Sequence, residues 1–90
     1  MKIFSEALPP EKYFRFREGV RIRMKCDWMG VRRGMCGTVV INDSYVVSGV
    51  ICGVIGVRFD EKFSGGHTCN GMCGPHEGYW VYPYQAEVIE

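Results

Sequence analysis

Residues 20–26 of this 90-residue chain, VRIRMKC, alternate apolar and basic side chains without a break. Successive side chains of an extended strand point to opposite faces, so strict alternation is typical of a strand with one buried face. We therefore expect a strand here, with Val20, Ile22, Met24 and Cys26 turned inward. A single strand has no stability of its own, so other strands must complete a sheet.

A glycine-interrupted run of β-branched residues, YVVSGVICGVIGVRFD, occupies positions 45–60. An ordinary helix does not hold that many valines, isoleucines and glycines. We expect two strands here, or one long strand with a bend or bulge. Further strands are predicted over residues 36–42, closed by a turn at 42–44, and over 78–83 and 86–89.

Five or six short strands, with turn signals between them and almost no helix, predict an all-β domain: a compact antiparallel barrel or sandwich. Ninety residues allow one domain at most. The inward positions of the strands define the predicted core, which consists of Val20, Ile22, Val39, Ile41, Val57, Phe59, Val81 and Val88.

The formal net charge is only +1, so bulk electrostatics does not mark the chain as a polyanion binder. Residues 11–33 nevertheless hold eight basic against three acidic side chains, a local excess of +5. Such asymmetry is typical of a surface for an anionic partner, and a solvated strand face is the alternative.

The order of short motifs along the chain resembles SH3-like small barrels of the KOW and mind-bomb types. The motifs are GV at 19–20, GTV at 37–39, VRFD at 57–60, WV at 80–81 and EVI at 87–89. The resemblance implies a compact SH3-like barrel over residues 19–90, after a lead-in at 1–18. It also implies a one-turn 3₁₀ corner before the last strand.

A Gly/His/Cys loop at 64–78 and the strand GYWV that closes it resemble a second pattern, G-H-x-C-x-G-x-C … G-W-W-V. Short, uncharacterised phage and bacterial proteins carry this pattern. In the present chain, Tyr79 stands where the pattern has its first tryptophan. The resemblance implies a phage accessory protein, with action against host defence as a role to consider, and it names no activity.

Four candidate metal ligands lie in this loop: His67, Cys69, Cys73 and His76. Zinc favours tetrahedral sets of two thiolates and two imidazoles, and the turn signal Asn70-Gly71 would bring the two cysteines together. The spacing departs from that of the usual zinc finger. Two alternatives to zinc therefore stay open: a packed glycine-rich loop, and a disulfide or redox pair.

Binding without turnover is the favoured function. No enzyme is expected, because a chain this short has little room for a pocket and nothing in it builds an oxyanion site. Exposed aromatic rings stack on bases and guanidinium groups clamp phosphate, so the predicted ligand is small, anionic and nucleotide-like, and is sequestered. The candidate ligand residues are Trp28, Arg32, Arg33, His67 and Trp80.

The alternative is a module that binds a host protein or, with less support, a nucleic acid, and holds a structural zinc loop. A homo-oligomer through sheet edges is compatible with either function. No segment has the roughly 20 apolar residues that span a bilayer, and residues 1–14 lack the apolar stretch of a signal peptide. The expected location is the cytoplasm, that of the host cell for a phage protein, where the five cysteines stay reduced.

Overall fold

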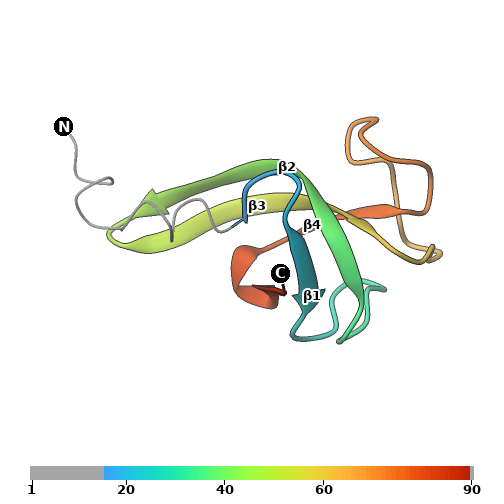
Figure 1. The fold of residues 1–90 in the computed structure, drawn as a ribbon, viewed down its shortest axis with the longest axis horizontal. Coiled ribbons are helices and arrows are strands. Elements are labelled where there is room, and N and C mark those ends of the chain that lie inside the picture. Colours follow the sequence, from blue (N-terminus) through green and yellow to red (C-terminus); the bar gives the residue numbers. More distant parts are fainter. Residues whose placement is uncertain (1–15, 90) are drawn as a thin grey trace.

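The computed structural model describes residues 16–89 (Figure 1). Within them, five strands form one antiparallel sheet in the order β4-β3-β2-β1-β5. A one-turn 3₁₀ helix, η2, turns the chain between the last two strands. The all-β prediction is confirmed. The elements are β1 (Arg21–Met24), β2 (Cys36–Val47), β3 (Val50–Phe59), β4 (Gly78–Val81), η2 (Pro83–Gln85) and β5 (Ala86–Val88).

The core receives side chains from every strand. In β1, Ile22 and Met24 are buried and Arg23 between them is exposed, as the alternating sequence predicts. Phe16, which the sequence assigns to the lead-in, is also buried in the core. Most predicted core residues are buried in this cluster or packed against it: Val20, Ile22, Val39, Val57, Phe59, Val81 and Val88.

Ile41 is the exception, since it is only half-buried and lies outside the core cluster. Val39 pairs with Val57, but Ile41 pairs with Gly56, because the register of β2 against β3 shifts between these positions. An extra residue in one strand exchanges the inward and outward phases of everything beyond it. The prediction assumed that the inward phase of Val39 continues to Ile41, and it was therefore wrong at Ile41.

The hairpin between β2 and β3 turns at Ser48 and Gly49, and the turn predicted at 42–44 is wrong. Both turn residues have positive φ, 51° and 80°, as a two-residue type I′ hairpin loop requires. Asn42 lies inside β2, where its Oδ1 accepts a local backbone hydrogen bond without reversing the chain. The segment 45–60 is consequently divided between β2 and β3.

β2 and β3 extend well beyond their neighbours (Figure 1). β1 pairs with β2 only along residues 36–38, and β4 pairs with β3 only along residues 55–58. Residues 42–54 therefore form a two-stranded projection, named here the outer ribbon. Nowhere in residues 16–89 is there a helix with the length and apolarity needed to cross a bilayer.

Candidate functional site

Two of the predicted ligand residues, Trp28 and His67, each approach a third, Trp80, which lies in β4. The Nε1–H of Trp28 donates a hydrogen bond of 3.1 Å to the carbonyl oxygen of Trp80. The ring centroids of His67 and Trp80 are 6.0 Å apart. Trp28 and Trp80 are both half-buried, and Trp28 packs against the core, so part of each ring serves the fold.

The two predicted arginines lie in different surroundings, although they are neighbours in the loop after β1. Arg32 forms an ion pair of 2.6 Å with Glu61, so its charge already has a partner. The backbone N–H of Arg33 donates to Oδ1 of Asp27 at 2.8 Å, while its side chain lines a concavity. The structure therefore does not bring the two guanidinium groups to one point.

This concavity, of about 460 Å³, is shallow and lies beside β1 and β5. It is named here the basic concavity and is lined by Arg23, Met24, Lys25, Arg33, Gly34 and Glu87. Glu87 faces Arg23 across the β1–β5 pair and forms an ion pair of 2.9 Å with it. Among residues 16–89, no carboxylate lies within ion-pair distance of Lys25 or Arg33. Three cations against one carboxylate favour an anion here.

An aromatic stack adjoins the loop that lines this concavity. Trp28 meets Tyr82 edge to face, with centroids 5.5 Å apart, and Tyr82 stacks on Tyr84 at 5.7 Å with planes 11° apart. Tyr84 is 69% exposed. The N–H of Lys25 donates 2.8 Å to the carbonyl of Gln85, which fastens the loop to η2. The stack consists of Trp28, Tyr82 and Tyr84.

Among the residues of the stack and the basic concavity, the sequence predicted only Trp28 and Arg33 for the site, and not Tyr82, Tyr84, Arg23 or Lys25. Arg23 and Lys25 were assigned to a basic strand face, because alternation alone does not show which neighbour covers that face. The available sequence signal for Tyr84 was the run YWVYPY. Its proline ends the strand, so the tyrosine that follows is not held in the sheet.

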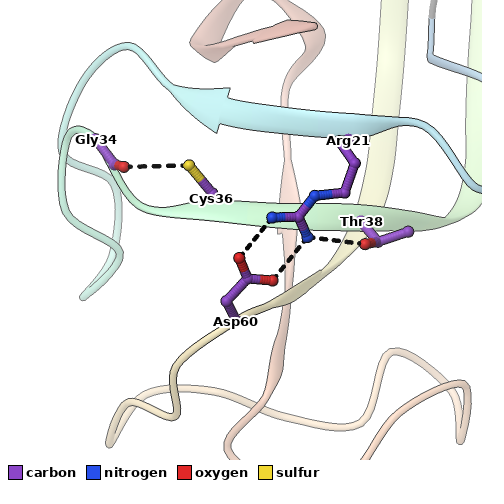
Figure 2. Close-up of polar contacts among 5 residues, drawn as sticks. All are labelled: Arg21, Gly34, Cys36, Thr38 and Asp60. Atoms are coloured by element: carbon purple, nitrogen blue, oxygen red, sulfur yellow. Dashed lines mark hydrogen bonds and ion pairs between the residues drawn. The ribbon is translucent and has the colours of Figure 1, made fainter. Parts of the chain in front are cut away.

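Arg21, the remaining cation of β1, is already paired. Figure 2 shows its guanidinium reaching over β2 to Asp60, which it meets with two hydrogen bonds of 2.7 and 2.6 Å. It also donates to the hydroxyl of Thr38 at 3.1 Å. The hydrogen bond to Asp60 raises the pKa of Arg21, and the same bond lowers the pKa of Asp60. This pair ties strands together and leaves Arg21 out of the candidate site.

The Gly/His/Cys loop packs against β3 and β4 through Cys69, which is fully buried. A Cβ placed on Gly78 would lie only 2.6 Å from Sγ of Cys73 and 2.7 Å from Sγ of Cys69. A Cβ on Gly56 would lie 3.4 Å from Sγ of Cys69. Gly78 therefore leaves the space that both sulfurs occupy, and the two sulfurs are neighbours.

The chemistry of this loop is that of protonated thiols. Burial raises the pKa of Cys69 to about 12, and burial also raises the pKa of Cys73. The thiolate is the nucleophilic form of cysteine, so neither sulfur is activated as a nucleophile near neutral pH. Nδ1 of His67 accepts a hydrogen bond of 3.0 Å from the N–H of Cys69, and His76 is exposed.

Within the part of the chain that the structure describes, no three His, Cys, Asp or Glu side chains are grouped so as to hold a metal ion. Zinc on His67, Cys69, Cys73 and His76 stays a prediction. Metal analysis of the purified protein, with thermal unfolding before and after chelation, tests it directly, because a structural zinc site is coupled to folding.

The single antiparallel sheet, with its 3₁₀ corner before the last strand, defines an SH3-like all-β module. A family model described as the Xrn1 SH3-like domain matches residues 14–86, most of the chain. The chain belongs to this family. Comparisons with curated proteins and with solved structures found no match. The SH3-like prediction is confirmed, whereas the phage and bacterial pattern stays a resemblance.

Proposed function

We propose that this domain is a non-enzymatic binding module for a small, anionic, planar ligand of the nucleotide class. The basic concavity carries the proposal, because Lys25 and Arg33 line it without a carboxylate partner among the described residues. Ammonium and guanidinium groups in such a position bind phosphate through charge-assisted hydrogen bonds. The phosphate of the ligand occupies the basic concavity.

The aromatic stack supports the second half of the proposal. Tyr84 presents an exposed ring at the end of the stack, and a base stacked on an aromatic side chain gains about 1–3 kcal/mol. Because the N–H of Lys25 is bonded to the carbonyl of Gln85, the stack and the cations adjoin one another. The base of the ligand stacks on Tyr84 in this proposal.

The proposed site differs from the one predicted by sequence. It keeps Trp28 and Arg33, and it replaces Arg32, whose charge is paired with Glu61, by Lys25. Sequestration of the ligand by a phage protein, against host defence and in the host cytoplasm, remains part of the proposal on the sequence resemblance alone.

The test is calorimetric titration of the protein with a panel of nucleotides and cyclic nucleotides. We expect at least one to bind with a Kd below about 1 mM, and Arg33→Ala to weaken that binding at least tenfold, about 1.4 kcal/mol. Arg32→Ala is the matched control, since it removes the same charge from the same loop but from a guanidinium paired with Glu61. Its Kd should not change.

Two results would overturn the proposal. The first is the absence of any ligand with a Kd below about 1 mM, which corresponds to only about −4 kcal/mol. The second is an equal loss in both arginine variants, which would show a response to overall charge and not to the concavity. Binding of single-stranded oligonucleotides alone, with a steep salt dependence, would favour the nucleic-acid alternative instead.

A further inference from the structure

The outer ribbon exposes a group of apolar side chains on one face. Tyr45 pairs with Cys52 and Val47 pairs with Val50 across the two strands, and cross-strand partners project to the same face. Tyr45 is 54% exposed, Val47 is 44% exposed and Val50 is 60% exposed. Large apolar side chains grouped in this way are typical of an interaction surface.

Beyond Asp43 at its base, the ribbon is free of charge. The fourteen consecutive residues 44–57 contain no Asp, Glu, Lys, Arg or His, and no proline. Natural proteins usually protect exposed edge strands with lysine or another charged side chain, or with proline. Among residues 16–89, no strand pairs with the outer edge of β2 beyond Val39 or with that of β3 before Ile55. Within the described part of the chain, the backbone edges of the ribbon are therefore open, in addition to its apolar face.

We propose that the outer ribbon is a homodimer interface, in which the ribbons of two copies lie antiparallel across a two-fold axis. In such an interface each patch meets its own copy, so a charged patch would repel itself and an uncharged one does not. The ribbon holds no cation with which to bind nucleic acid or anionic lipid. This surface is separate from the basic concavity and does not depend on the proposed function.

The size of a stable interface constrains how the copies meet. A specific dimer buries about 800 Å² on each partner, which is more than the turn at the tip of a hairpin provides. The contact must therefore run along the ribbon, so that the apolar face and an open edge of each copy are both covered. Tyr45, the largest exposed side chain of the ribbon, is the expected anchor.

Sedimentation velocity in the presence of a thiol reductant tests the proposal on the full chain. We expect the wild type to sediment as a dimer and Tyr45→Lys as a monomer, because two like charges would enter the apolar patch at the centre of the interface. Met72→Lys is the matched control, since Met72 is 52% exposed and lies in the Gly/His/Cys loop, away from the ribbon. This control should remain a dimer.

The proposal is overturned if the wild type is a monomer at every concentration, or if the two lysine variants behave alike. A monomer that binds vesicles of neutral phospholipid would assign the ribbon to a lipid surface instead. The circular dichroism of Tyr45→Lys should match that of the wild type, since the ribbon lies outside the core. If that variant fails to fold, Val50→Lys, 60% exposed beside the turn, repeats the test.

Discussion

At the residue scale, the two cysteine sulfur atoms of the Gly/His/Cys loop limit the size of the side chains that fit beside them. Gly78 and Gly56 carry no side chain where the loop packs against β3 and β4, and Sγ of Cys69 occupies the space above them. At Gly78 these contacts leave no room for even a methyl group, whereas the closest contact at Gly56 is with the ring of Trp80, at 3.0 Å. The described contacts are those of a packed loop, while the zinc site and the redox pair stay predictions.

Gly78→Ala is expected to lower the free energy of unfolding by about 1–3 kcal/mol, because the new Cβ would press on both sulfurs. Urea unfolding measures the loss. In the double variant Cys69→Ala/Gly78→Ala, one of the two clashing sulfurs is gone, so its cost should be smaller than the sum of the two single costs. Additive costs would contradict the proposed contact.

At the scale of elements, β1 is held in the sheet by few backbone pairs. It pairs with β2 at three positions and with β5 at three positions. The bidentate contact of Arg21 with Asp60 adds a connection from β1 to the end of β3, and the contact with Thr38 includes β2 (Figure 2). This three-strand contact explains why one cation of the basic strand is structural.

The Arg21–Asp60 pair should make stability depend on acid pH. Because Arg21 lowers the pKa of Asp60, ionised Asp60 stabilises the fold above the pKa that it has in the unfolded chain, about 3.9. This stabilisation is lost as the pH falls through the lower pKa of Asp60 in the folded state. Both side chains are about half exposed, so the gain is below about 1 kcal/mol. Asp60→Asn should reduce stability at pH 7 and not at about pH 2, as measured by urea unfolding. Identical losses at both pH values would contradict this explanation.

At the scale of the whole molecule, one small core joins all five strands with the segments before and between them. Phe59 lies within it, 3% exposed, and meets Phe63 edge to face with centroids 5.7 Å apart. A domain of this size has only a few kcal/mol of net stability. Loss of one large core side chain is therefore expected to affect the entire fold.

Phe59→Ala should cost about 3–5 kcal/mol, enough to unfold much of the population at room temperature. Thermal unfolding followed by circular dichroism measures the effect. Ile41→Ala is the contrasting variant, because Ile41 is half-buried beyond the register shift and outside the core cluster, and it should cost clearly less. A thermal transition of Phe59→Ala equal to that of the wild type would mean that the described core is wrong.

The sequence by itself determined the fold class and most of the core. Alternation in residues 20–26 and the β-branched run in 45–60 are local patterns, and the side-chain period of a strand is a local property. They were sufficient to predict an all-β domain and to place Ile22, Val57 and Phe59 inside it. The resemblance to SH3-like barrels implied the corner at η2, and Pro83 indicated the end of the strand before it.

Only the tertiary structure decided the remaining features, because each depends on a partner distant in sequence. The phase at Ile41 was set by how β2 and β3 pair across the register shift. Arg32 lost its role in the proposed site because the fold brings it to Glu61, 29 positions away. Lys25 and Arg33 came together because the loop after β1 folds back beside β5. A charge is compensated by whatever the fold places beside it, and local sequence does not contain that information.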